Sequence, residues 1–194
     1  MQRRLAWWAV VALVALGVGP EARRLAAAEP ALPAPADLVP VTIRDVKMDR
    51  TTDTPLVILE TAKKDRLLVV AIGHGEAFAI LRKLRAVEPP PRPMTHDLLK
   101  SVVEGLGGKL DKAVITRLDD GTFYAVLVVR RGETIVPIDA RPSDAMALAL
   151  RMAAPIFVAR AVLDEAGIRP GQLEEPNEQP PFQRPPPGGE KQAI

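Results

Sequence analysis

The feature that most limits what this chain can fold into is the uneven distribution of its proline and large aliphatic residues. The chain has 194 residues and 20 prolines, and the prolines are dense over 30–40 and 170–194. Beyond the first 28 residues, nearly all large aliphatic side chains fall between Val41 and Ile168. A segment without such side chains cannot bury enough surface to offset the entropy lost on folding. We therefore expect one folded domain over 41–169, an Ala/Pro spacer over 29–40 and a disordered Pro-rich tail over 170–194.

The first 28 residues have the three parts of a secretory signal. Arginines precede an uncharged apolar run from Leu5 to Gly19, and the alanines at 26–28 offer a cleavage site. The run is shorter than the roughly 20 residues of a membrane-spanning helix. We expect an exported protein, periplasmic or secreted, with no stable membrane span after signal removal. The alternative is a membrane anchor formed by an uncleaved N-terminal segment, because Arg23 and Arg24 lie between the apolar run and the alanines.

The composition excludes several kinds of site. The chain has no cysteine, so disulfides, thiol nucleophiles and cysteine-bound zinc are ruled out. Its formal net charge is +2, so the totals show no broad basic excess of the kind that steers proteins to nucleic acid, although they leave a local patch open. Aromatic residues are only 4% of the chain, which predicts an aliphatic core.

The spacing of apolar residues predicts an α+β fold: a single compact domain of mixed strands and three to four helices. Strands are expected at 41–48, 55–61, 67–72, 109–118, 122–131, 134–140 and 155–158. Helices are expected at 76–87, from an N-cap at Thr95 to the glycines at 105–108, at 142–152 and at 161–166. In the first helix, Phe78, Leu81 and Leu84 are expected to face the core, with Ala77 and Ile80 as further candidates. Strands that come in runs, with helices at irregular intervals, are typical of this class.

Six short motifs occur in a fixed order along the chain. They are Ile72-Gly73 with Glu76-Ala77, Arg92 to Leu99, Asp120 to Ala125, Ile138 to Ala145, Leu148 to Arg151, and Ala154 to Ile156. Over about 41–168 this set resembles the bifunctional nuclease domain family. The family's name refers to members that degrade both DNA and RNA, so the resemblance implies nucleic acid as the substrate.

Phosphodiester cleavage requires an activated water, neutralisation of the phosphate charge and a proton for the leaving oxygen. Nucleases without a thiol often use carboxylates that hold divalent metal ions. The motif positions offer a set for this chemistry. We expect the catalytic residues to be His96, Asp97, Asp139, Arg141 and Asp144. We expect a divalent metal ion, Mg or Mn, to be held by Glu76, Asp97, Asp139 and Asp144.

Each of these residues also has a structural explanation. Asp97 and Asp144 lie in the first turns of expected helices, where a carboxylate favours the helix dipole. Asp139, Arg141 and Asp144 could form an ion-pair network that holds a strand–helix corner. The chain has no Walker loop, HExxH motif or dinucleotide fingerprint. The competing hypothesis is therefore a non-catalytic module that binds a ligand, regulates a partner or forms a homo-oligomer. Convergence of the candidate residues within metal-binding reach would separate the two hypotheses.

Overall fold

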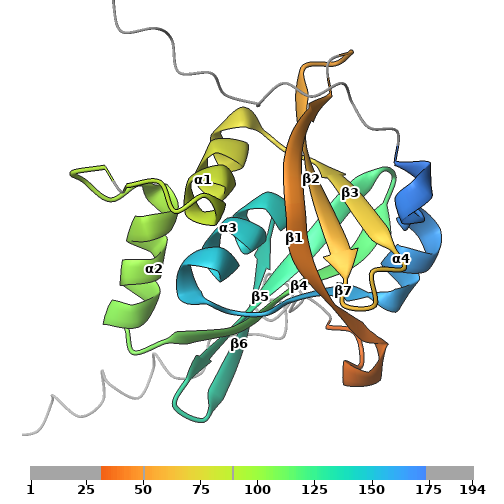
Figure 1. The fold of residues 1–194 in the computed structure, drawn as a ribbon. Helices are drawn as coiled ribbons and strands as arrows, with labels where there is room; N and C mark the ends of the chain where they lie inside the picture. Colours follow the sequence, from red (N-terminus) through yellow and green to blue (C-terminus); the bar gives the residue numbers. More distant parts are fainter. Residues whose placement is uncertain (1–31, 50, 89, 174–194) are drawn as a thin grey trace, which may run out of the picture.

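A sheet in the order β3-β2-β1-β7-β4-β5-β6 organises the computed structural model, which describes residues 32–49, 51–88 and 90–173 (Figure 1). Neighbouring strands are antiparallel except β4 and β7, which are parallel. The strands are β1 Leu38–Asp49, β2 Thr54–Thr61, β3 Leu67–Ala71, β4 Lys109–Asp119, β5 Thr122–Arg131, β6 Thr134–Ala140 and β7 Ile156–Ala159.

The helices are α1 His74–Leu84, α2 Thr95–Gly105, α3 Pro142–Met152 and α4 Arg160–Ala166, with short 3-10 turns η2 Pro35–Asp37 and η3 Pro170–Gln172. Helix α3 packs on β4 and β5, and both α1 and α2 pack against α3 (Figure 1). The α+β class and the expected helices are thus confirmed. In the described ranges, no helix is long and apolar enough to cross a membrane.

The main core lies between α3 and the sheet. Helix α3 buries its small and aliphatic residues almost completely, among them Met146, Leu148 and Ala149. They pack with the apolar residues that alternate along the strands, such as Leu127 and Ile115. Burial of one such large side chain stabilises a protein by about 1.5–3 kcal/mol. This packing fixes α3, and therefore the first turn of α3, relative to the end of β6.

Local sequence explains two details of the sheet. Asp120 and Gly121 have φ of 46° and 72°, the left-handed conformation that a two-residue hairpin turn requires between β4 and β5. Strand β6 is an edge strand, which tolerates Pro137 because proline has no N–H to give to a further strand. The register of β1 with β2 shifts between Ile43 and Asp45, where β1 has a β-bulge or irregularity.

Some element boundaries differ from the prediction. Strand β1 begins at Leu38, because residues 38–40 pair with β7, so the spacer expected over 29–40 is too long at its C-terminal end. The expected leader over 1–28 lies outside the described residues, as does the tail from 174 onward. The disordered tail was expected to begin at residue 170, but Pro170–Gln172 form the 3-10 turn η3. Export therefore stays a prediction.

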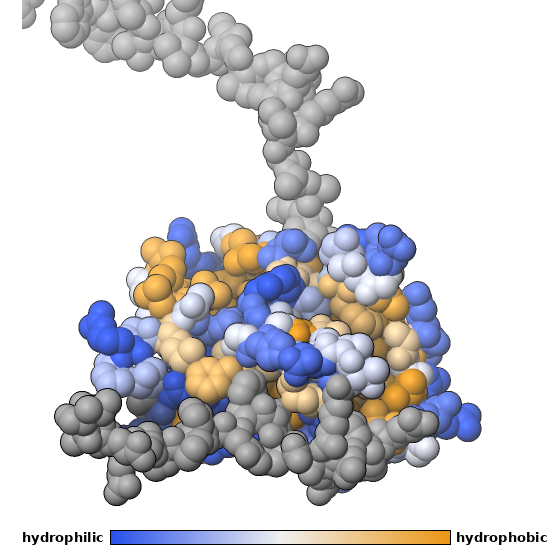
Figure 2. All heavy atoms as spheres, turned by 90° about the horizontal axis from the view of Figure 1, so that it is seen from above, coloured by the Kyte–Doolittle hydropathy of each residue, from blue (hydrophilic) through white to orange (hydrophobic). Residues whose placement is uncertain are grey.

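The inner face of α1 was predicted in part: Leu81, Ala77 and Ile80 are buried as expected, whereas Phe78 and Leu84 are not. Its buried residues are Ala77, Ala79, Ile80 and Leu81. Phe78 and Leu84 are 42% and 39% exposed, and hydrophobic side chains reach the surface on this side of the molecule, at the left of Figure 2. The reason is that α1 lies close against α3, which favours small alanines at the contact over the larger residues. Phe78 instead lies near the guanidinium of Arg82.

Candidate functional site

The corner between β6 and α3 places two of the candidate residues. Strand β6 ends at Ala140, Arg141 is the N-cap of α3 in an extended conformation, and Pro142 is its first helical residue. Proline suits this position because its fixed φ matches a helix and its missing N–H would have no helical partner. Asp144 follows in the first turn, where a carboxylate is favoured by the helix dipole. Arg141 and Asp144 therefore meet at the start of a well-packed helix.

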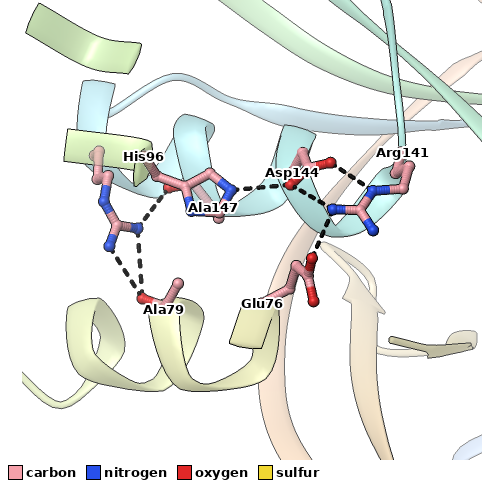
Figure 3. Close-up of polar contacts among 7 residues, drawn as sticks. Glu76, Ala79, His96, Arg141, Asp144 and Ala147 are labelled. Atoms are coloured by element: carbon pink, nitrogen blue, oxygen red, sulfur yellow. Dashed lines mark hydrogen bonds and ion pairs between the residues drawn. The ribbon is translucent and has the colours of Figure 1, made fainter. Parts of the chain in front are cut away.

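The guanidinium of Arg141 joins two carboxylates (Figure 3). Its Nε donates to Asp144 Oδ2 at 2.7 Å, and its Nη2 donates to Glu76 Oε1 at 2.6 Å and to Asp144 Oδ1 at 3.2 Å. These hydrogen bonds, first with Asp144 and then with Glu76, raise the pKa of Arg141. The side chain of Arg141 is nevertheless 65% exposed. The guanidinium thus remains open to solvent and to an anion.

Glu76 reaches this guanidinium from the first turn of α1. Gly73 precedes that helix as its N-cap, and a side chain at position 73 would require the Glu76 carboxylate to move from its place beside Arg141. The glycine therefore leaves room for the carboxylate, a role that its sequence context did not predict.

His96 joins the same group from the first turn of α2. Its Nε2 lies 3.0 Å from Asp144 Oδ1, and the residue is only 8% exposed. Burial raises the pKa of Asp144, but hydrogen bonds from Arg141 and His96 outweigh it and hold this pKa below its usual value. Asp144 is therefore an ionised acceptor, which makes Nε2 of His96 the donor and leaves the lone pair of neutral His96 on Nδ1.

The Nδ1 atom of His96 is not sealed in the core. No described residue forms a hydrogen bond with it, yet no buried polar side-chain atom of the described ranges lacks a partner. It follows that Nδ1 retains contact with solvent. The lone pair of His96 can then accept a proton from a molecule at the surface.

Asp97, the next residue, belongs to a different pair. Its Oδ1 accepts from Arg151 Nε at 2.6 Å, and its Oδ2 accepts from the backbone N–H of Met94 at 3.1 Å. Burial raises its pKa, but these hydrogen bonds outweigh it and lower the pKa overall. The bond to Met94 also corrects the expected start of α2: Met94 is the N-cap, and Thr95 is the first helical residue. The Asp97 carboxylate thus accepts the N–H of the N-cap residue, whereas the sequence had predicted Thr95 as the N-cap.

Asp139 is separated from the cluster by the sheet. Its register partner on β5 is Val126, and partners in register share one face of a sheet. Val126 belongs to a small apolar group with Val114 and Val128, whereas its neighbours Ala125 and Leu127 point to the main core. Asp139 is exposed on the face opposite α3. A role for it beside Asp144, as the sequence predicted, does not fit this placement.

The donor set was tested for the expected metal ion. Among the residues that the structure describes, no three His, Cys, Asp or Glu side chains come together to hold a metal. Glu76 and Asp144 bind Arg141, and Asp97 binds Arg151. A cation already occupies the position between the carboxylates, so these residues do not fit a metal centre as they are arranged. The sequence also missed Arg151, whose role had no signal beyond its place in a motif.

These features define a mixed α+β domain whose His96, Asp144, Arg141 and Glu76 side chains form one hydrogen-bonded cluster at the surface. The family description that matches residues 57–171, more than half of the chain, is the Bifunctional nuclease domain. The chain belongs to the bifunctional nuclease domain family.

Similarity to individual proteins agrees with this assignment. An uncharacterized protein of Mycobacterium tuberculosis is 41% identical over 128 residues, which cover 66% of this chain and 76% of the relative. Bifunctional nuclease 1 of Oryza sativa subsp. japonica is 27% identical over 108 residues, which cover 54% of this chain and 32% of the relative. Bifunctional nuclease of Oryza minuta is similar to the same extent. The match to the rice proteins thus covers about a third of their length.

Proposed function

We propose that the protein hydrolyses phosphodiester bonds in both DNA and RNA at the His96, Asp144 and Arg141 cluster. The observation that carries the proposal is the hydrogen bond from His96 to an ionised Asp144, next to the exposed guanidinium of Arg141. A carboxylate that fixes one nitrogen of an imidazole leaves the other nitrogen as a base. A planar, exposed guanidinium is well suited to hold a phosphate. Membership of the family supports nucleic acid as the substrate.

Each residue has one role in the proposed reaction. Arg141 would bind the phosphate and neutralise the charge that grows on it in the transition state. Nδ1 of His96 would accept a proton from the water that attacks phosphorus. The bond from phosphorus to the leaving sugar oxygen then breaks, and solvent supplies the proton for that oxygen. Asp144 and Glu76 are positioning residues, because they orient His96 and Arg141 and do not touch the substrate.

Activity on both nucleic acids restricts the nucleophile. Only RNA has a 2′-hydroxyl, so an enzyme that attacks with this group could not cleave DNA. The proposed attack by water serves both polymers equally. The metal ion expected from the sequence has no place in these steps, and the requirement for one stays a prediction that the experiment below addresses.

The test is cleavage of supercoiled plasmid and of a single-stranded RNA by the purified chain, with chelator present or absent. Both substrates should be cut by the wild type, and the cleavage by a His96→Ala variant should be lower by about 10²–10⁴-fold, the usual contribution of general acid–base catalysis. Cleavage that persists unchanged in His96→Ala would contradict the proposal. Cleavage abolished by chelator would show that the metal prediction holds and that the described roles are incomplete.

The second candidate is a non-catalytic module, and one observation favours it. Arg141 already binds Glu76 of α1 and Asp144 of α3, so the cluster also fastens two helices together. In that case neither substrate is cut, and replacement of Arg141 lowers stability without affecting any reaction.

A further inference from the structure

A cavity of about 250 Å³ lies between the last turn of α1 and the first turn of α2. Its charged lining residues are Arg82, Lys83, Arg151 and Asp97. Three of them are cations and one is an anion, and Asp97 is already bound to Arg151 at 2.6 Å. The cavity therefore has an excess of positive charge.

Arg82 and Lys83 carry this excess. Arg82 donates to the sulfur of Met94 at 3.2 Å and to the backbone carbonyl of Glu88, neither of which is a carboxylate. Within the described ranges, Lys83 makes no hydrogen bond or ion pair. Both residues lie in the last turn of α1, where they complement the negative end of its dipole.

A second cavity provides a comparison. It has a volume of about 310 Å³ and lies at the turn between β2 and β3, beside α4. Its cations Lys63, Arg66 and Arg160 are accompanied by Asp65 and Asp164, so its charges are close to balance. Size alone therefore does not identify an anion site, whereas the unbalanced cations of the smaller cavity do.

The cationic cavity and the proposed catalytic cluster lie along one line on α3. Asp144 belongs to the cluster and Arg151 to the cavity, and the seven helical steps from one to the other span about 10 Å at 1.5 Å each. On α2 the same two places are occupied by the consecutive residues His96 and Asp97. A single strand can thus reach both places at once.

We propose that the cavity at Arg82 and Lys83 binds a phosphate of the nucleic-acid strand whose scissile phosphate is held at Arg141. This inference rests on the proposed function, because the strand that occupies the cavity is the strand that is cleaved. Arg82 and Lys83 contact the phosphate directly. Arg151 already donates its hydrogen bonds to Asp97, Ala79 and Ala147, so it does not contact the phosphate and contributes only its positive charge.

The test measures binding, so that it does not depend on cleavage. A short fluorescent single-stranded oligonucleotide is titrated with the His96→Ala protein at several salt concentrations. The same titrations are made after Arg82→Gln and Lys83→Gln are added together. Each cation that contacts a phosphate contributes about 0.7 to the slope of log affinity against log salt, so the slope should fall by about 1.4. Inorganic phosphate at fixed ionic strength should compete with the oligonucleotide less strongly after these changes than before them.

The matched control replaces Lys63 and Lys64, two exposed lysines of the turn between β2 and β3, by glutamine. It removes the same charge far from α1, so its slope should stay at the parent value. An unchanged slope in the Arg82 and Lys83 variant, or an equal fall in the control, would overturn the inference. A fall confined to the cavity variant, in a protein whose wild type cuts no nucleic acid, would uphold the phosphate site and reject the proposed function.

Discussion

The two arginines at the ends of α3 make similar ion pairs in different surroundings. Arg141 binds Asp144 at 2.7 Å, and Arg151 binds Asp97 at 2.6 Å. The side chain of Arg141 is 65% exposed, whereas that of Arg151 is 6% exposed. Arg151 also donates to the backbone carbonyls of Ala79 and Ala147, so all its hydrogen-bond partners belong to the packed helices.

The difference separates a structural pair from a candidate functional one. A buried arginine whose hydrogen bonds are all internal stabilises the packing of α1, α2 and α3, and its removal leaves polar groups without partners. An exposed arginine contributes little to stability through its ion pairs. Its cluster with Glu76, Asp144 and His96 is therefore the better candidate for a functional site. The following predictions test this division, beginning with the largest expected effect.

Removal of Arg151 should cost the most stability. We expect Arg151→Met to lower the free energy of unfolding by about 3 kcal/mol, the lower end for a broken buried pair because Asp97 is partly exposed. Chemical denaturation would measure the loss. The matched control is Arg117→Met, which breaks the exposed pair with Asp119 and should change stability little. Equal losses in the two variants would mean that burial does not distinguish these arginines.

The same substitution at the other end of α3 should have the opposite profile. We expect Arg141→Met to reduce cleavage by about 10²–10³-fold, the effect of losing one group that stabilises transition-state charge. Its melting temperature should stay near that of the wild type, since the side chain is mostly exposed. A large fall in melting temperature, with cleavage that follows only the folded fraction, would make Arg141 a structural residue like Arg151.

Acid should weaken both pairs. The pKa values of Asp97 and Asp144 are lowered in the folded protein, so each contributes stability that is fully present above its unfolded pKa, about 3.9. That stability is lost as the pH falls from there through the lowered folded pKa. We expect the free energy of unfolding to drop more steeply below about pH 4 in the wild type than in Asp97→Asn with Asp144→Asn. Parallel curves for the two proteins would show that neither carboxylate is stabilised by its arginine.

The smallest effect is expected at Asp139. It lies across the sheet from the cluster and is exposed, so Asp139→Asn should leave cleavage and melting temperature unchanged. Activity assays and thermal unfolding of this variant, alongside Arg141→Met, would show this directly. Loss of cleavage in Asp139→Asn would place the reaction on the opposite face of the sheet.

Local sequence was enough to predict most elements of the fold. The bounds of β5, β6 and α3 agree with the prediction. Glycine and proline favour particular backbone conformations, so residues such as Gly121 and Pro142 mark where one element ends and the next begins. The inner face of α1 was not predictable in the same way. Phe78 and Leu84 have the spacing of a core stripe, but contact with α3 selects the side with alanines.

The candidate site was predicted in part for a similar reason. Spacing along the chain brought Arg141 and Asp144 into one helical turn, and the motif order suggested that His96 lies near them. The sequence could not show that Asp139 lies on the face of the sheet opposite α3, because that depends on the register of β6 with β5. Nor could it show that Asp97 is held by Arg151, 54 residues further along the chain.

The most direct test of the account is the rate of cleavage per folded molecule in Asp144→Asn. The carboxylate at this position holds Nε2 of His96 as a donor and keeps Nδ1 free as the base. An amide can turn to donate to Nε2 instead, which would move the proton to Nδ1 and remove the base. We expect the rate to fall by about 10²–10⁴-fold on DNA and RNA alike, with a changed pH profile. A rate and pH profile equal to those of the wild type on both substrates would contradict the proposed site.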